Sequence, residues 1–469
     1  MLGLAAVVAG CSTAPVGPDY RVPGQALALR TEAATGFQQA QPAIFTSAPL
    51  PAHWWRLYGD TQLDALVQEA LEGNTDLRQA VANLERVRAI EDEVAGGRRP
   101  TLGVGGGPSF GHASGLSMLR PSYEPPNAFH YSASLGLSYQ MDPFGQLQRA
   151  LEAAVAGSAA AEAARDLVRV QVAAGVARAY AETCATGLRL RSAEHSLALQ
   201  EEAVALTERM RAAGRVGAID AARARRQAEQ LRAALPPLQA QRQGALYRLA
   251  TLSGRLPESF PQELAGCSVP PQLAATAIPV GDGAALLRRR PDIRQAEREL
   301  AAATARIGVQ IADRYPKVNL GLSVASAGAL DGFARRDTLA WSLGPLISWS
   351  LPDTGVVDAR IAQAEAGARV ALARFDGTVL TALRETESAL NVYARELDRR
   401  AALQAARDEA ATVAAQARRL YQGGKVGYLD ALDAERALAD SEAALAGSEA
   451  ALVDEQVQLF LALGGGWES

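Results

Sequence analysis

Few residues in this chain have the type and spacing that a chemical function needs, and one acidic pair is the clearest candidate. Asp430 and Asp433 lie three residues apart, which places both carboxylates on one face of a helix. Paired negative charges of this kind can attract cations. The alternative is that both are solvated residues at the start of a helix.

The motifs expected of an enzyme are missing from the sequence. Gly423–Val426 lacks the spacing and the Ser or Thr of a phosphate-binding loop, and there is no helical histidine pair. The histidines are scattered along the chain: His53, His112, His130 and His195. We therefore predict no enzymatic activity, no cofactor and no metal site.

The charge distribution does not suit a nucleic-acid partner. The formal net charge is −4 over 469 residues, and the only run of three basic residues is Arg288–Arg290. Because this run precedes Pro291 at a predicted helix start, we expect a solvated helix entry there rather than a phosphate site.

The first residues resemble an export signal that ends at a cysteine. Leu2–Gly10 is a short apolar run, too short to span a bilayer, and small residues precede Cys11. This pattern resembles a bacterial lipobox, in which the cysteine is lipidated and becomes the mature N-terminus. Ser12 follows the cysteine, and a residue other than aspartate there is typical of sorting to the outer membrane. An ordinary signal peptide without lipidation is the alternative.

The sequence contains one unit written twice. Asp76–Ala80 reappears almost unchanged as Asp292–Ala296 with an offset of 216 residues. Gly214–Gly217 reappears in the same way as Gly424–Gly427 with an offset of 210 residues. Two separate segments that agree this well indicate an internal duplication.

Each copy is predicted to contain a short helix, two strands, a very long helix, a sharp turn and a medium helix. Prolines separate the short helices, about 61–95 and 284–314, from the strands, and Pro236-Pro237 must kink or break the first medium helix. The predicted order is a signal peptide 1–10, an N-terminal segment 11–60, repeat 1 over 61–254 (hairpin 101–141, helices 145–211 and 217–252), a linker 255–283, repeat 2 over 284–464 (hairpin 317–350, helices 355–421 and 428–463) and a tail 465–469.

The strands alternate between apolar and small or polar residues, and aromatic residues stand at both ends of two of them. The pairs are Tyr131 with Tyr139 and Trp341 with Trp349. This spacing is typical of the two aromatic girdles of a lipid-facing strand of about 9–11 residues. Alternation alone would also fit an ordinary half-buried sheet. Because about eight strands are needed to close a barrel, and the chain offers fewer, we predict that the chain oligomerises.

Two proline-free stretches, 145–211 and 355–421, each predict a helix about 100 Å long. Leucines at seven-residue spacing, such as Leu438, Leu445 and Leu452, indicate coiled-coil packing. A coiled coil of no special function would show the same repeat. Alanine, however, occupies several faces of each helix, so we expect each helix to pack on neighbours at both sides, as in a cylinder.

Taken together, these features resemble the TolC-like outer-membrane efflux factors, and within them the lipoprotein branch that partners resistance–nodulation–division pumps. The segments that carry the resemblance are Cys11 with Gly17–Tyr20, Trp54-Trp55 with Tyr58–Asp60, Leu287–Ile293 and Leu461–Trp467. The resemblance implies a mostly α-helical homotrimer, in which three chains form a twelve-stranded outer-membrane β-barrel continuous with a periplasmic helical tunnel. It also implies an equatorial belt made of the N-terminal segment, the linker and the C-terminus.

The resemblance assigns roles to the two turns that share a glycine pattern. Family members dock the periplasmic adaptor protein at the tips that correspond here to Gly214, Arg215, Val216, Gly217 and to Gly424, Lys425, Val426, Gly427. The alternative is that the glycines only permit a tight turn.

Asp430 and Asp433 match the aperture aspartates of the family, so a trimer would carry a ring of six carboxylates at a constricted periplasmic mouth. In the first copy, Asp220 matches Asp430 and is assigned to the gate with it, whereas Arg223 stands where the second copy has Asp433. Arg223 could pair with Asp433 across a subunit interface and hold the mouth shut.

Two further cysteines could pair in the family's architecture. Cys184 lies near the middle of a long helix and Cys267 lies in the equatorial linker. In the oxidising periplasm a disulfide between them is expected. Two free buried thiols are the alternative.

The function that the resemblance implies is passive conduction from an inner-membrane pump and its adaptor, across the outer-membrane lipid, to the cell exterior. One alternative is the duct of a type I protein secretion system. Another is a pore-less periplasmic coiled-coil protein, which heat-modifiable trimers in outer-membrane fractions would exclude. The sequence does not identify the cargo.

Overall fold

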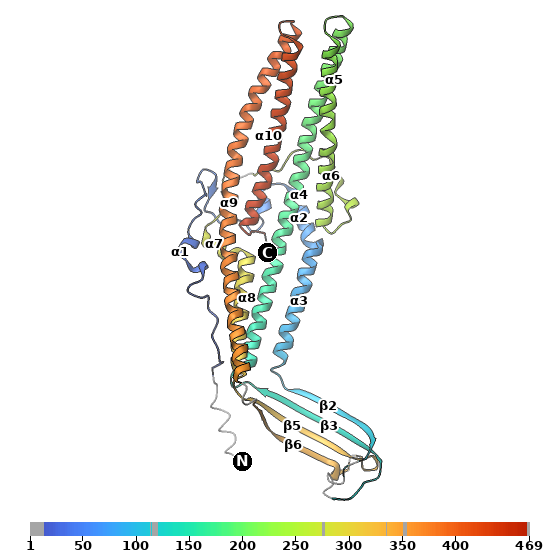
Figure 1. Cartoon of the computed structure of the whole chain (residues 1–469), viewed down its shortest axis with the longest axis vertical. Coiled ribbons are helices and arrows are strands. Elements are labelled where there is room, and N and C mark those ends of the chain that lie inside the picture. The colour runs from blue at the N-terminus through green and yellow to red at the C-terminus, as the bar shows by residue number, and fades with distance from the viewer. Residues whose placement is uncertain are drawn as a thin grey trace. The chain divides into compact units, whose positions relative to one another are not determined.

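A computed structural model describes residues 14–112, 114, 121–273, 277–333, 335–349 and 354–466, so that Cys11 and Trp467 lie outside the described residues. The described chain is mostly helical, with a four-stranded sheet and a short two-stranded one (Figure 1). Its helices are α1 Thr31–Ala34, α2 Thr61–Gly73, α3 Thr75–Gly96, α4 Gln146–Ala212, α5 Ala218–Ala233, α6 Leu235–Leu252, α7 Gly283–Arg289, α8 Pro291–Ala312, α9 Thr354–Gln422 and α10 Tyr428–Ala462. Its strands are β1 Phe45–Thr46, β2 Thr101–Gly111, β3 Ala128–Met141, β4 Ile278–Pro279, β5 Lys317–Ala329 and β6 Leu339–Ser348.

The described residues divide into two compact units. Unit 1 takes its residues from 14–23, 84–161 and 296–375, and it contains the four-stranded sheet. Unit 2 takes its residues from 24–83, 162–295 and 376–466. Helices α3, α4, α8 and α9 each contribute one end to unit 1 and the other end to unit 2.

The two long helices have the lengths that the proline-free stretches predict. α4 contains 67 residues and α9 contains 69, which corresponds to about 100 Å of helix each. Alanine has the highest helix propensity and therefore favours an unbroken helix in such segments. The medium helix of the first copy is interrupted at Ala234, two residues before the Pro236-Pro237 pair.

The prediction of one unbroken short helix in each copy is wrong. α2 ends before Asn74, whose backbone is extended with ψ at 133°. The Asn74 Oδ1 atom accepts hydrogen bonds from the backbone N–H groups of Asp76 and Leu77 at 2.9 and 3.0 Å, and so begins α3 as a new helix. α7 and α8 are separated by Arg290, whose ψ of 122° is the extended conformation that the following Pro291 requires.

The residue at each break also donates a hydrogen bond to the end of a medium helix. Asn74 Nδ2 donates to the carbonyl of Leu252 at the end of α6, at 2.9 Å. Arg290 Nη1 donates to the carbonyl of Ala462 at the end of α10, at 2.8 Å. These donors and acceptors are related by the same offsets of 216 and 210 residues that relate the two copies in sequence. The two halves of unit 2 therefore use the same contact at corresponding positions.

Arg290 is buried rather than solvated, which corrects the expectation of a solvated helix entry. Its side chain is 9% exposed, and Nη2 donates to Asp292 Oδ2 at 2.6 Å and to Glu385 Oε2 at 2.9 Å. The neighbouring Arg289 donates through Nε to the carbonyl of Leu463 at 2.9 Å. Both guanidinium groups thus meet the carbonyl end of α10, where the helix dipole favours a cation.

The core of unit 2 is built around the Trp54-Trp55 segment. Both indoles are fully or almost fully buried, and the Trp54 ring stacks on Phe460 with centroids 4.6 Å apart. Tyr58, buried nearby, donates to Gln456 Oε1 at 3.1 Å. Burial raises the pKa of the Tyr58 hydroxyl, so this group remains a donor at neutral pH. The two tryptophans are therefore part of the hydrophobic core of unit 2.

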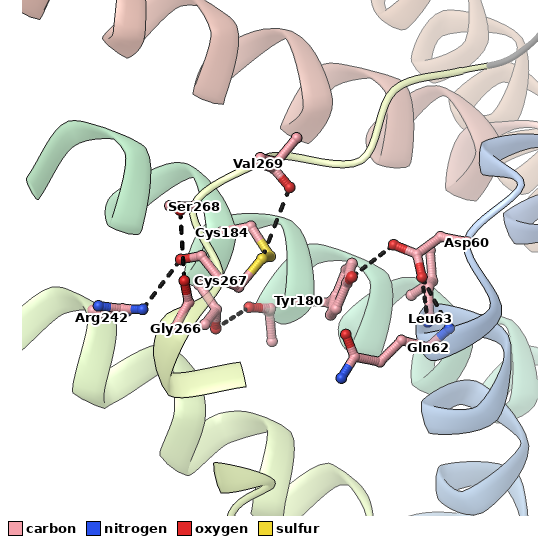
Figure 2. Close-up of a disulfide and its surroundings, with 12 residues drawn as sticks. Asp60, Gln62, Leu63, Tyr180, Cys184, Arg242, Gly266, Cys267, Ser268 and Val269 are labelled. Carbon is pink, nitrogen blue, oxygen red and sulfur yellow. Dashed lines mark hydrogen bonds between the residues drawn. A yellow bond between two sulfur atoms is a disulfide. The ribbon is translucent and has the colours of Figure 1, made fainter. Parts of the chain in front are cut away.

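The linker lies across the middle of α4 and is bonded to it there. Cys184, which is fully buried, forms a disulfide with Cys267, 83 residues further along the chain (Figure 2). Arg242 Nη2 donates to the carbonyl of Cys267 at 3.1 Å. Gly187 permits the close crossing, because a Cβ there would lie only 2.0 Å from the same carbonyl oxygen. One turn before Cys184, the hydroxyl of Tyr180 donates to Asp60, as the same view shows.

The four-stranded sheet of unit 1 is antiparallel throughout, in the order β2-β3-β5-β6. Residues directly opposite one another in such a sheet lie on the same face. The register pairs Leu137 with Leu102 on one side and with Leu322 on the other, and Leu322 in turn with Leu343. The large apolar residues of all four strands therefore share one face, except Leu346 of β6, which pairs with Asn319 on the other face.

The burial of Arg290 leads to a prediction about stability. Replacing Arg290 with Met should lower the free energy of unfolding by about 2 kcal/mol, because a buried carbonyl and two carboxylates lose their charged donor. Arg288→Met is the matched control, since Arg288 is exposed and its loss should cost less than about 0.5 kcal/mol. Denaturant unfolding monitored by tryptophan fluorescence compares the two variants. Equal losses would contradict the role given to Arg290.

The disulfide predicts a larger effect. The double variant Cys184→Ser, Cys267→Ser should lose about 4 kcal/mol of unfolding free energy, because the bond closes a loop with a sequence separation of 83 residues. Thermal unfolding with and without a reductant provides the measurement. The reductant should destabilise the parent protein and leave the double variant unchanged. A double variant as stable as the oxidised parent would show that the bond contributes nothing.

Candidate functional site

The turns after α4 and α9 have the same backbone design. Gly214 and Gly424 adopt the left-handed conformation, with φ of 68° and 67°. In the first turn the N–H groups of Gly214 and Arg215 donate to the carbonyls of Arg211 and Met210, both at 2.9 Å. The second turn repeats the pattern, with Gly424 and Lys425 donating to the carbonyls of Tyr421 and Leu420, again both at 2.9 Å. This is the Schellman ending of a helix, which glycine makes possible.

The helices that leave the two turns also begin in the same way. Asp220 Oδ2 accepts a hydrogen bond from the N–H of Gly217 at 3.2 Å, and Asp430 Oδ2 accepts one from the N–H of Gly427 at 3.1 Å. An acidic side chain in the first turn thus satisfies a main-chain donor that the helix leaves open and complements the positive end of the dipole. Asp430 therefore has a structural task that does not depend on any gate.

Asp433 is placed differently from Asp430. Its side chain is 76% exposed, and the closest cation is its own helix neighbour Arg436, with Nη1 3.7 Å from Oδ1. Arg223 lies 3.9 Å from Asp220 and half exposed. We expected Arg223 and Asp433 to pair across a subunit interface. Within one chain, each of them instead lies near an opposite charge on its own helix. At such exposure an ion pair contributes little to stability.

Each tip presents an apolar side chain that the sequence analysis did not single out. Ile219 is 68% exposed and Leu429 is 44% exposed. Both follow the second glycine of their turn by two residues, and they are related by the offset of 210 residues. The duplicated turns contain this signal in the sequence, because an apolar residue recurs at the same offset as the glycines and charges. Each tip thus combines a basic residue with an exposed apolar one.

The sheet of unit 1 presents a broad apolar face. Most of the large side chains on it are exposed: Leu102, Val104 and Phe110 of β2; Phe129, Leu135, Leu137 and Tyr139 of β3; Leu320, Leu322 and Val324 of β5; Leu339, Trp341, Leu343 and Ile347 of β6. The opposite face carries glycines and serines, as in the Ser323–Ser342 pair, whose hydroxyls are 2.8 Å apart. Apolar faces of this size are not left to water in a monomeric soluble protein.

Three of the four aromatic residues expected at the girdles are exposed, and one is not. Trp341 is 76% exposed, Trp349 54% and Tyr139 38%. Tyr131 is only 6% exposed, because the ring of Phe333 packs on it at 4.9 Å and its hydroxyl lies 2.9 Å from Thr338 Oγ1. The segment between β5 and β6 therefore covers Tyr131, which corrects the expectation of an exposed ring there.

Nothing in the described part of the chain suggests a metal centre or an apolar membrane-crossing helix. Among the described residues, no three His, Cys, Asp or Glu side chains lie together in an arrangement that could hold a metal ion. The described helices also lack a stretch long and apolar enough to cross a bilayer.

Comparison with known proteins gives consistent matches over the whole chain. The family model described as outer membrane efflux protein matches residues 66–255 and 284–465. The solvent efflux pump outer membrane protein SrpC of Pseudomonas putida is 31% identical, over 98% of this chain and 96% of that protein. The cation efflux system protein CusC of Escherichia coli O157:H7 is 28% identical, over 99% of this chain and 98% of that protein.

Among solved structures, the outer-membrane channel OprN superposes with a TM-score of 0.89 and 35% identity, covering 96% of this chain and 99% of that one. The family model matches this chain in two separate ranges. The chain belongs to the outer membrane efflux protein family.

Proposed function

We propose that this chain is the outer-membrane exit duct of a tripartite efflux pump, and that it conducts substrates passively to the cell exterior. The observation that carries the proposal is the exposed apolar face of the sheet, in a chain that belongs to the outer membrane efflux protein family. Two relatives, SrpC and CusC, are by name components of a solvent efflux pump and of a cation efflux system. These names favour efflux over type I protein secretion.

The working form in this proposal is a homotrimer with a twelve-stranded barrel. Each chain supplies a four-stranded sheet whose outer strands, β2 and β6, have no further partner among the described residues. Unpaired edges and an apolar face are unfavourable in a lone chain, and a closed barrel in lipid removes both problems. Four strands are too few for closure, whereas three chains supply enough. The long helices would line a periplasmic tunnel in the same symmetry.

The duplication gives each chain two equivalent tips. Corresponding contacts at Asn74 and Arg290, and corresponding turns at Gly214 and Gly424, support descent from a single doubled unit. We assign the tips to docking of the periplasmic adaptor, which in turn joins the inner-membrane resistance–nodulation–division pump. The exposed Ile219 and Leu429 are the side chains best suited to anchor such a partner.

The carboxylates of the second tip are proposed to line the periplasmic mouth. Asp433 is the stronger gate residue of the pair, because it is largely exposed, whereas Asp430 also caps its own helix. Arg223 of a neighbouring subunit would pair with Asp433 and hold the mouth closed. Protonation or cation binding would then weaken the closed state.

The membrane attachment proposed for the chain has two parts. The sheet face meets the hydrocarbon, with Tyr139, Trp341 and Trp349 near its edges, and Cys11 carries the lipid that resembles those of bacterial lipoproteins. One acyl anchor adds affinity without spanning the bilayer. The protein is therefore located in the outer membrane and extends into the periplasm.

The two faces of β6 allow a sharp test of the membrane assignment. Leu343→Arg should cost about 2–4 kcal/mol of stability in the membrane, because it places a cation against hydrocarbon. Ser342→Arg, one residue away on the opposite face, should assemble normally. The measurement is the amount of heat-modifiable trimer in the outer-membrane fraction. If Ser342→Arg is lost from that fraction while Leu343→Arg is retained, the faces are assigned the wrong way round.

The gate assignment predicts a gain of conductance. Asp433→Asn should raise the single-channel conductance in planar bilayers and weaken block by divalent cations, because the pair with Arg223 is lost and only three of the six carboxylates of the ring remain. Asp430→Asn, which keeps an oxygen able to cap the helix, should add a smaller increase.

Asp220→Asn is the matched control, since Asp220 caps its helix in the same way at the other tip. Because Asp220 also lies 3.9 Å from Arg223, its loss leaves Arg223 free to pair with Asp433, and the conductance should not rise above that of the parent channel. A fall in conductance for Asp433→Asn would mean that the carboxylate only attracts cations and does not hold the mouth closed.

A further inference from the structure

The N-terminal segment of unit 1 is held by one buried arginine, which is not explained by the sheet or by the tips. The Arg149 side chain, near the start of α4, is 4% exposed. Its Nε donates to the carbonyl of Val16 at 3.1 Å, and its Nη2 donates to the carbonyls of Gly17 at 3.1 Å and Pro15 at 3.4 Å. One guanidinium group thus binds three successive main-chain carbonyls.

Two carboxylates complete the set of partners. Arg149 Nη2 donates to Asp19 Oδ1 at 2.7 Å, and Nη1 donates to Glu152 Oε2 at 2.7 Å. Only Glu152 belongs to the same helix, so without the N-terminal segment most donors of this buried cation would lose their partners. Buried charges of this kind are rare unless paired, which indicates that the site is built for the segment.

Glycines on three elements permit the close approach. Gly17 has a φ of 90°, and a Cβ there would lie 2.5 Å from the Cα of Gly308 on α8. A Cβ on Gly308 would lie 2.7 Å from both the Val16 carbonyl oxygen and the Cγ of Arg149. Gly145, just before α4, faces Pro15 with similarly little room, at 2.4 Å. Any larger residue would push the segment away.

The segment is held where the sheet meets the helices. The N–H of Val16 donates to the carbonyl of Phe144 at 3.1 Å, and Phe144 lies between the end of β3 and the start of α4. The Phe144 ring stacks on Tyr315, which precedes β5, with centroids 4.4 Å apart. The attachment point of the segment is therefore fixed at the helix-side ends of two strands.

We propose that Arg149 is a latch that fixes the N-terminal segment at this junction, so that a lipid on Cys11 enters the membrane beside the strand ends. Cys11 precedes Pro15 by four residues, which is a tether of about 14 Å at full extension. Without the latch the nearest side-chain attachment is Tyr20, whose hydroxyl donates to Glu297 at 2.8 Å. The tether to Tyr20 would be about 30 Å.

The shorter tether matters because one lipid anchor binds a membrane only marginally. Holding the anchor close to the lipid-facing sheet raises its effective concentration at the bilayer, so that both attachments act together. This inference rests on the lipidation of Cys11 that the proposed function includes.

The test asks whether the segment stays bound after its chain is cut. A site for a sequence-specific protease is inserted between Pro23 and Gly24, and the full-length protein is purified in detergent and cleaved. Each variant is also made with Cys11→Ser, so that no lipid holds the cleaved peptide in the detergent micelle, and retention is compared in this form. With Arg149 intact the peptide 11–23 should remain bound through gel filtration. In Arg149→Met it should dissociate at least about tenfold faster, since charge-assisted hydrogen bonds are lost.

Two further variants separate the latch from general damage. Gly308→Ala keeps every charge but closes the space beside Val16, and it should release the peptide as Arg149→Met does. Arg306→Met removes an exposed cation from the same helix, α8, and it should retain the peptide. Unaltered circular dichroism identifies the variants that are folded.

The result that would overturn the latch is equal retention, or equal loss, of the peptide in the parent and in both Arg149→Met and Gly308→Ala. The mass of the released peptide reports separately whether Cys11 carries a lipid. A bound peptide without lipid would support the latch and remove its membrane role. Conductance of the same preparations tests the duct independently of both.

Discussion

Main-chain carbonyl groups outside helices and strands need donors when they are buried, and in this protein arginine side chains from the helices supply them. Arg149 serves the N-terminal segment, Arg242 serves the linker, and Arg290 serves the last turn of α10. A guanidinium group has five donors in a rigid fork and can bind several carbonyls at once. Since an unsatisfied buried carbonyl is costly, these residues decide where the irregular segments can lie.

The helical part of the fold follows closely from local sequence. Long alanine-rich stretches without proline contain no helix-breaking residue, so the extents of α4 and α9 could be predicted. The breaks at Asn74 and Arg290 could not, because each depends on a distant helix end. Arg290 binds the carbonyl of a residue 172 positions away. Nothing in the run Arg288–Arg290 distinguishes the buried arginine from the exposed one.

The candidate site shows the same division between local and distant causes. Alternation along the strands predicted which residues share a face, and the register of the sheet joins these faces into one. The burial of Tyr131 could not be predicted, since its cover comes from Phe333, far along the chain. The capping role of Asp430 was readable in principle, because an acidic residue three positions after a glycine is a helix-start signal.

The bond between Cys184 and Cys267 has a consequence for how the chain matures. The sequence contains three cysteines, so an unfolded chain can in principle form any of three pairs. Attachment of a lipid to Cys11 removes one sulfur from that choice, and a single pairing remains. In the proposed lipoprotein, acylation before folding would therefore make oxidation unambiguous, with no mispaired species for a disulfide isomerase to correct.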